Sequence, residues 1–270
     1  MAEIEFPKKT LNYIIDEALT QNGLYNLVNV IRTTTKRDSY AYATGTGYGA
    51  FHTDRSKAKE LTDTSVDLID VPMYPVYTNE TLDNRVEDEE TELANRLRQN
   101  APAKLARTIT AAILGGTKEV PTSPFDSAFN AASAVNLADP AALQALSLGT
   151  KGRANGWLFN ADAESNLKTA LTAGSSVNPL TFGLNDGFPI DGKPSYYQDL
   201  ETAKLTDVAG IVGDWSKAIL VISDNVNFQR IDGTTDKSLA LANSIFYMLE
   251  WHVGFAVADK AYFSKFKATA

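Results

Sequence analysis

Two stretches near the end of the chain decide the fold: "VGDWSKAILVISDNVNFQRID" at residues 212–232 and "EWHVGFAVADKAYFSKF" at residues 250–266. Both are rich in β-branched and aromatic residues, which favour strands. The second stretch alternates apolar and polar positions, the period of a strand with one buried face. The chain is therefore predicted to end in strands that complete a sheet.

A long helix is predicted upstream of these strands, from Leu82 to Leu114, because its apolar residues recur on one face. It would span roughly 50 Å at about 1.5 Å per residue. The glycines of "GGT" at residues 115–117 end it, and Pro102 marks a kink or a restart. Acidic residues open this segment and basic residues close it, an order that complements the helix dipole.

The remaining segments contain shorter elements. The stretch "VDLIDVPMYPVYT" at residues 66–78 predicts a strand, edge-like because it holds Pro72 and Pro75. Residues 118–200 alternate Ala-rich helices with Gly, Asn and Pro turns, which indicates an inserted domain. Within it, "GWLFNADAESNLKTAL" at residues 156–171 predicts a strand that ends at Asn160 and a helix that begins at residue 161 or 162. An amphipathic helix is expected over residues 10–32, interrupted at Gly23.

Residues 33–63 lack apolar periodicity and predict an extended hairpin or loop of a length that is usually functional or bound to a partner. They include "YATGTGYGAF", residues 42–51, with glycines at alternate positions. A dinucleotide site needs G-x-G-x-x-G between a strand and a helix, and this stretch has neither that spacing nor a following helix pattern. The glycines are better explained as points where the loop turns.

The composition gives little support to enzyme chemistry. The chain has no Cys and two His, and it lacks HExxH and G-x-S-x-G motifs, so no catalytic, cofactor or metal residues are predicted. No apolar run is long enough to cross a bilayer. The formal net charge of −8 argues against tight binding of nucleic acid.

The order of segments resembles the major capsid proteins of tailed phages, which have the Hong Kong-97-type fold. Gly213 to Lys217 matches a Gly-Asp-aromatic-Ser-Lys turn of that family, and Val253 to Phe263 matches its final strand. The resemblance implies an α+β fold with an amino-terminal arm, an extended loop, a peripheral domain with a long spine helix, and an axial domain. The corresponding residues would be 1–34 for the arm, 35–65 for the loop, 66–117 and 201–270 for the peripheral domain, and 118–200 for the axial domain.

The resemblance also implies a function without enzymatic activity. Subunits of this family form hexamers and pentamers that close into an icosahedral shell around double-stranded DNA, without sequence-specific binding and without a membrane. The expected location is the virion capsid, assembled in the host cytoplasm. Expected partners are copies of this chain, a portal and decoration proteins. The arm helix begins within ten residues of Met1, so we expect either a separate scaffolding protein or unaided assembly.

Contacts between subunits are expected from the extended loop, which would lie over a neighbouring subunit. The residues that would make these contacts are Arg37, Gly45, Gly47, Gly49, Arg55, Lys57 and Lys59.

Some members of the family crosslink a loop lysine to an asparagine of another subunit. Lys57 and Lys59 are the candidate lysines, and Asn243 and Glu250 would share a face if their segment were helical. Covalent ladders on denaturing gels would support this speculative crosslink.

Three alternatives stay open at this point. An encapsulin-like compartment would use the same fold around a cargo enzyme instead of DNA. A carboxylate-based hydrolase would use the acidic cluster between Asp83 and Glu92. A phage tail or decoration protein would form tubes or trimers.

Overall fold

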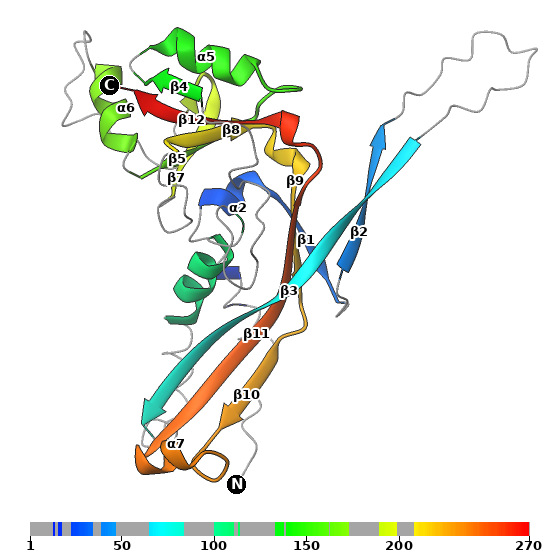
Figure 1. The fold of residues 1–270 in the computed structure, drawn as a ribbon, viewed down its shortest axis with the longest axis vertical. Coiled ribbons are helices and arrows are strands. Elements are labelled where there is room, and N and C mark those ends of the chain that lie inside the picture. The colour runs from blue at the N-terminus through cyan, green and yellow to red at the C-terminus, as the bar shows by residue number, and fades with distance from the viewer. Residues whose placement is uncertain are drawn as a thin grey trace, which may run out of the picture.

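The computed structural model describes residues 13, 16–17, 23–34, 39–46, 65–83, 100–110, 113, 133–137, 139–161, 163–172, 189–198 and 208–269. The molecule is elongated, with a long sheet forming a shaft and a compact unit of strands and helices at one end (Figure 1). A hairpin projects sideways from the shaft.

The long sheet has the strand order β1-β9-β11-β3-β2, and β10 also pairs with β11. All pairs are antiparallel except β1 with β9. The strands are β1 (Asn29–Thr33), β2 (Ser39–Thr46), β3 (Ser65–Asp83), β9 (Ala218–Ser223), β10 (Asn227–Ile231) and β11 (Ser244–Val257). The short helix α2 (Gly23–Leu27) precedes β1.

The compact sheet has the strand order β4-β12-β8-β5-β7-β6. Its strands are β4 (Ser133–Asn136), β5 (Gly156–Asn160), β6 (Pro189–Ile190), β7 (Lys193–Gln198), β8 (Gly210–Gly213) and β12 (Phe263–Thr269). The helices α5 (Pro140–Leu148) and α6 (Ala163–Thr172) accompany it. The predicted strand that ends at Asn160, followed directly by a helix, is confirmed by β5 and α6.

Two chain segments cross side by side from one sheet to the other. One runs from β8 through the 3₁₀ turn η1 (Trp215–Lys217) into β9, and the other runs from β11 through η2 (Lys260–Tyr262) into β12. The two segments stay paired on both sides of the crossing, since Gly213 lies opposite Phe263 and Ala218 opposite Val257. Together they form one bent ribbon that joins the compact unit to the shaft.

This crossing corrects one detail of the sequence interpretation. β8 and β12 fall within residues 201–270, the segment expected to be peripheral, yet both strands belong to the compact sheet formed by residues expected to be axial. The boundary at residue 200 therefore does not separate the two sheets. The division into arm, loop, peripheral and axial domains remains a prediction.

The main core lies between β11 and the helical residues 100–110 and 113. Burial alternates along β11, and the buried side chains pack in one cluster with those of the helix. From β11 these are Ile245, Tyr247, Leu249, Trp251 and Val253, and from the helix Ala101, Leu105, Ile109 and Ile113. Each fully buried large side chain contributes about 1.5–3 kcal/mol. Every second side chain of β11 thus packs against the apolar face of the helix, whose residues recur every 3.6 positions.

The predicted start of the long helix at Leu82 is wrong. Leu82 belongs to β3, is buried, and pairs with Ile245 of β11. An apolar residue at this position fits the strand alternation as well as the helical repeat, so the pattern alone chose the wrong element. Residues 84–99 lie outside the described part of the chain, and Pro102 lies within the helical residues 100–110.

The strand predicted over residues 66–78 is confirmed and extends over Ser65–Asp83 as β3. Its first part pairs with β2 and its second part with β11, and the change of partner occurs between Pro72 and Met73. Each residue of β3 thus has one partner strand in the described residues. This arrangement accommodates Pro72 and Pro75, which cannot donate to a ladder.

Candidate intersubunit interfaces

The projecting hairpin is formed by β2 and the first part of β3, with a register that runs from Ser39 opposite Pro72 to Thr46 opposite Ser65. Gly45 lies in β2 opposite Val66. Leu68, on the β3 side, is 71% exposed. The other candidate contact residues lie outside the described residues: Arg37, Gly47, Gly49, Arg55, Lys57 and Lys59.

The residues considered for a crosslink are not arranged as on a helix. Asn243 lies in a turn with φ 52°, and Glu250 lies within β11, opposite Asn227 and Tyr77. At about 3.3 Å per residue in a strand, seven positions correspond to roughly 23 Å. Most of the segment is a strand, so the condition for a shared helical face is not met. Because Lys57 and Lys59 lie outside the described residues, the crosslink itself stays a prediction.

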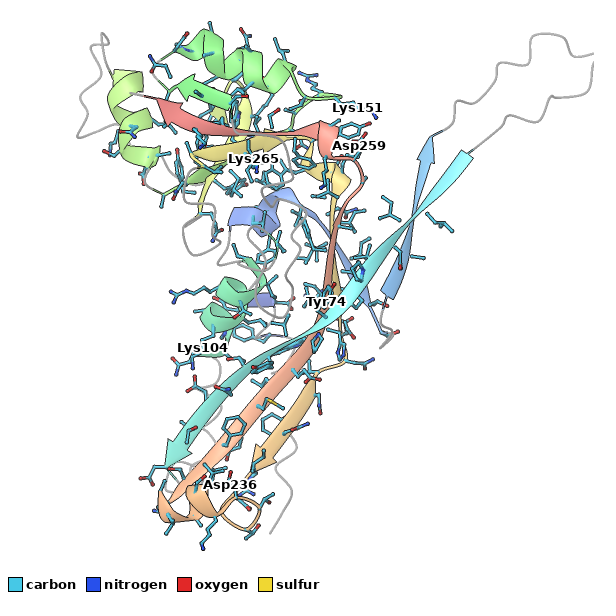
Figure 2. All side chains as sticks on the ribbon, viewed as in Figure 1. Tyr74, Lys104, Lys151, Asp236, Asp259 and Lys265 are labelled. Atoms are coloured by element: carbon cyan, nitrogen blue, oxygen red, sulfur yellow. The ribbon has the colours of Figure 1, made fainter. Side chains whose placement is uncertain are left out.

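Charged and aromatic side chains hold the joint between the two sheets. Lys151 forms an ion pair with Asp259 at 2.7 Å, and both lie beside the bend of the ribbon (Figure 2). The ring of Tyr262 lies near two ammonium groups, 5.1 Å from Lys151 and 5.7 Å from Lys217. Hydrogen bonds from Lys151 and from the Ala261 amide lower the pKa of Asp259. The carboxylate thus stays ionised and the joint stays paired at neutral pH.

Trp215 packs at the centre of the same joint. Its side chain is fully buried, its indole N–H donates to the carbonyl of Gly156 at 3.0 Å, and its ring meets Phe263 edge to face at 5.2 Å. Its backbone N–H donates to the side chain of Asn155 at 2.9 Å. One residue of η1 therefore contacts β5 and β12, both strands of the compact sheet.

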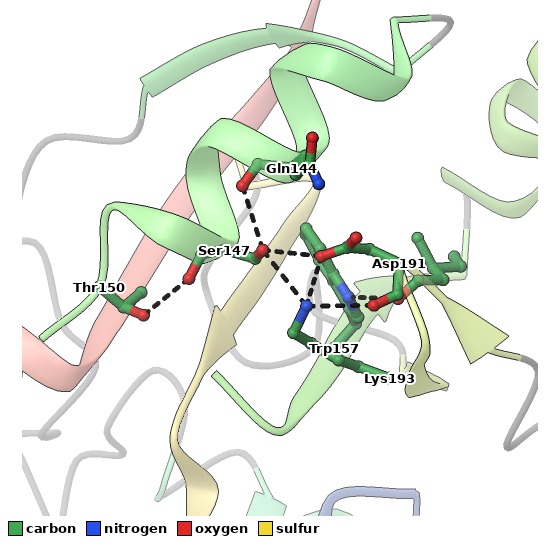
Figure 3. A network of polar contacts seen from close by, with 7 residues as sticks. Gln144, Ser147, Thr150, Trp157, Asp191 and Lys193 are labelled. Atoms are coloured by element: carbon green, nitrogen blue, oxygen red, sulfur yellow. Dashed lines mark hydrogen bonds and ion pairs between the residues drawn. The ribbon is translucent and has the colours of Figure 1, made fainter. Parts of the chain in front are cut away.

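A polar network fixes the β6–β7 hairpin to α5 (Figure 3). The hairpin turns at Asp191 and Gly192, both with positive φ, the arrangement favoured by an Asp-Gly pair in a two-residue turn. The Ser147 hydroxyl lies 2.9 Å from the carboxylate of Asp191, which also pairs with Lys193. These bonds lower the pKa of Asp191, first through Lys193 and then through Ser147.

This network resembles a Ser-Lys pair of hydrolases only in composition. A base for Ser147 would have to be a lysine free to accept a proton, but the Lys193 amine is engaged by the Asp191 carboxylate. Trp157 adds to the rigidity, because its indole N–H donates to the carbonyl of Ile190 at 3.0 Å. The geometry supports a structural role for these residues.

The turn between β10 and β11 lies at the end of the shaft far from the compact unit and carries α7 (Lys237–Leu241). Asp232 accepts hydrogen bonds from the hydroxyl and the amide of Thr234, and Arg230 pairs with it at 2.7 Å. Asp236 caps α7 by accepting from the Ser238 amide at 2.8 Å. Two aspartates thus define the shape of a turn whose helix has no buried residue.

Asp232→Asn is expected to make this turn less sensitive to acid. The hydrogen bonds from Thr234 and from Arg230 lower the pKa of Asp232 to about 2. A depressed folded-state pKa contributes stability that is present above the unfolded value near 3.9 and is lost as the pH falls toward 2. The protection of amides 232–243, corrected for the intrinsic exchange rate at each pH, should fall as the pH drops through this window in the wild type and change less in Asp232→Asn. Equal pH profiles would contradict the assignment.

Two kinds of site are missing from the described residues. No group of three or more His, Asp or Glu side chains among them is placed to hold a metal ion. No helix within the described ranges is long and apolar enough to cross a membrane.

The model of the phage capsid family matches this chain over residues 6–268. No curated protein matches the sequence. Solved structures with the same fold include Gordonia phage Cozz, at 16% identity and TM-score 0.61 over 92% of this chain and 86% of that chain. Microbacterium phage Oxtober96 matches at 13% identity and TM-score 0.63 over 92% and 91%. The capsid of an empty GTA particle matches at 16% identity and TM-score 0.59 over 100% and 93%.

These findings confirm the Hong Kong-97-type α+β fold that the order of segments predicts. They give no support to the encapsulin-like compartment or to the carboxylate-based hydrolase. Because the family match covers nearly the whole chain, the protein belongs to the phage capsid family and is a major capsid protein of the tailed-phage type, a structural subunit of a virion shell.

Proposed function

We propose that this capsid protein assembles as hexamers and pentamers into an icosahedral shell that encloses double-stranded DNA. The observation that carries the proposal is the projecting β2–β3 hairpin with its exposed Leu68. A two-stranded hairpin is marginally stable alone in water, so it needs a covering surface. A neighbouring copy of the chain supplies that surface in a shell.

The shape of the molecule supports the same proposal. A compact unit at one end and a long shaft suit a subunit that converges with its neighbours at one end and reaches other capsomers at the other (Figure 1). Closed symmetric assemblies repeat each contact many times, so that modest single contacts add up to a stable particle.

The charge of the chain suits a container for DNA. With 33 acidic and 25 basic residues, its formal net charge is −8. The shell and the genome both carry negative charge, which disfavours tight binding of the DNA phosphates. The shell therefore encloses the DNA without sequence-specific binding.

Further partners follow from this function. A portal, decoration proteins and a separate scaffolding protein would bind the shell, which would assemble in the host cytoplasm. The role is structural and requires no enzymatic activity.

Electron microscopy and sedimentation of the chain, expressed with and without its neighbouring genes, test the proposal. Closed shells that contain DNA are the expected result. Shells that contain a cargo protein in place of DNA would favour the compartment reading, and a monomer under all conditions would contradict assembly.

Leu68→Asp is expected to reduce closed shells about tenfold or more, because burying a leucine is worth about 1.5–3 kcal/mol at each contact. Leu68→Met is the matched control, since methionine keeps an apolar side chain at the same exposed position of the hairpin. Particle yield is measured for both variants after circular dichroism confirms their folding. Loss in both variants, or in neither, would contradict a specific role for the hairpin.

A further inference from the structure

The second part of β3 has an open edge. Residues Met73 to Asp83 pair with β11 on one side, and no other strand of the described residues pairs with them. An edge of this length presents unpaired N–H and C=O groups and is a template for a further strand.

A single contact shows which backbone groups point outward. The Lys104 amine, on the helix beside β3, donates to the backbone carbonyl of Asn79 at 3.3 Å, and from this contact we infer that the carbonyl faces the open edge. In an antiparallel pair both backbone groups of a residue point to the same side, and the side alternates along the strand. With Asn79 facing the open edge, the alternation directs the N–H groups of Tyr77, Asn79 and Thr81 outward and those of Thr78 and Glu80 toward β11.

A groove runs between this edge and the helix. It has a volume of about 360 Å³ and is lined by Tyr77, Thr78, Asn79, Ala103, Lys104, Arg107 and Thr108. Tyr77 is 54% exposed, and among the described residues the buried hydroxyl of Thr78 has no hydrogen-bond partner. The groove thus offers an aromatic surface beside a row of backbone donors and acceptors.

The two basic side chains that line the groove differ in their ion pairing. Lys104 pairs with Glu80 and lies on the helix beside β3 (Figure 2). Arg107 is exposed on the same helical face and has no ion pair within the described part of the chain. Within the described residues, the charge of Lys104 is therefore paired, while Arg107 presents an exposed positive charge on the same face of the helix.

We propose that the open edge from Tyr77 to Thr81 and the adjoining groove bind an extended acidic segment of a second copy of this chain. The segment adds as a strand to β3 and places a carboxylate on Arg107. On addition the Lys104 amine leaves the Asn79 carbonyl and keeps Glu80 as its partner. A second copy is the fitting occupant because the family forms shells of repeated subunits and the chain has an excess of acidic residues. The inference rests on the proposed self-assembly and names one of its contacts.

Hydrogen exchange resolved to single residues tests the edge directly. The amides of Tyr77, Asn79 and Thr81 should exchange about tenfold more slowly in assembled particles than in dissociated subunits. The amides of Thr78 and Glu80 bond to β11 in both states and serve as internal controls. Unchanged exchange at the outward amides would overturn the proposal.

Comparison of Arg107→Glu with Arg153→Glu distinguishes an effect at the groove from a general effect of reversing a surface charge on assembly. Arg153 is also exposed and also lines a hollow, near the β6–β7 hairpin. We expect about tenfold fewer particles with Arg107→Glu and no change with Arg153→Glu. Equal assembly of the two variants, with folding verified by circular dichroism, would overturn the role of Arg107.

A photo-crosslinking phenylalanine analogue in place of Tyr77 identifies the occupant. Within particles, it should form adducts of two copies of this chain that map by mass spectrometry to an acidic segment. Adducts with another protein, or none, would overturn the proposed occupant. Shells with an unprotected edge would refute this inference alone, whereas small oligomers with a protected edge would refute the proposed shell and keep the edge contact.

Discussion

Trp215→Ala is expected to lower the free energy of unfolding by about 3–5 kcal/mol, the usual cost of removing a buried aromatic side chain. The indole is fully buried, contacts Phe263 edge to face, and donates to the Gly156 carbonyl. Its removal leaves a cavity at the joint and an acceptor without its donor. Because β5, η1 and β12 meet there, the packing between the compact unit and the ribbon would be weakened.

Urea unfolding of Trp215→Ala and Trp215→Phe separates the contribution of packing from that of the indole hydrogen bond. Phenylalanine keeps much of the apolar volume but cannot donate to Gly156, so its cost should be smaller, with about 1–3 kcal/mol from the unsatisfied carbonyl. If the alanine variant were no less stable than the phenylalanine variant, packing at the joint would not be the source of the stability.

Gly213→Ala should be at least as damaging, at about 3 kcal/mol or more, because the added carbon has no space. A Cβ at this position would lie 2.4 Å from Cδ1 of Phe263 and 2.5 Å from the backbone carbonyl oxygen of Tyr262. A ring can shift, but the Tyr262 carbonyl accepts the Asp214 amide at 3.0 Å across the ribbon and cannot move without breaking that hydrogen bond. Overpacking of a core usually costs about 1–3 kcal/mol, and a clash with backbone lies at the upper end or beyond.

Gly192→Ala is the matched control for this steric effect. Gly192 has φ 70° but no atom within 4 Å of an added Cβ, so alanine there meets backbone strain alone, about 1–2 kcal/mol. Thermal and urea unfolding of both variants should rank Gly213→Ala as the less stable. The reverse order would show that the space around Gly213 adjusts easily.

Local patterns predicted the elements whose partners are close in sequence. The turn at Gly213 to Lys217 that leads into a strand, and the strand that ends at Asn160 before a helix, are confirmed as β8–η1–β9 and β5–α6. Both depend on residues that are neighbours along the chain. The start of the long helix was wrong because Leu82 suits either period, and its pairing with Ile245, far along the chain, decides for the strand.

The intersubunit surfaces were harder to predict for the same reason. Arg107 appeared in the sequence as one of several basic residues near the end of a helix. Only the packing of that helix beside β3 places it in a groove along an open edge. Likewise, no local signal assigns β8 and β12 to the compact sheet, since each strand is chosen by partners far away in the sequence.

The paired crossing between the two sheets has a mechanical consequence. A single connecting strand would let the compact unit swivel about one backbone. Here two backbones cross together, and the amide of Ala258 donates to the carbonyl of Lys217 at 2.9 Å between them. The two paired backbones therefore resist rotation of the compact unit about the long axis of the molecule. A force along that axis is shared between two covalent segments. A subunit built in this way transmits load through its joint with little twist.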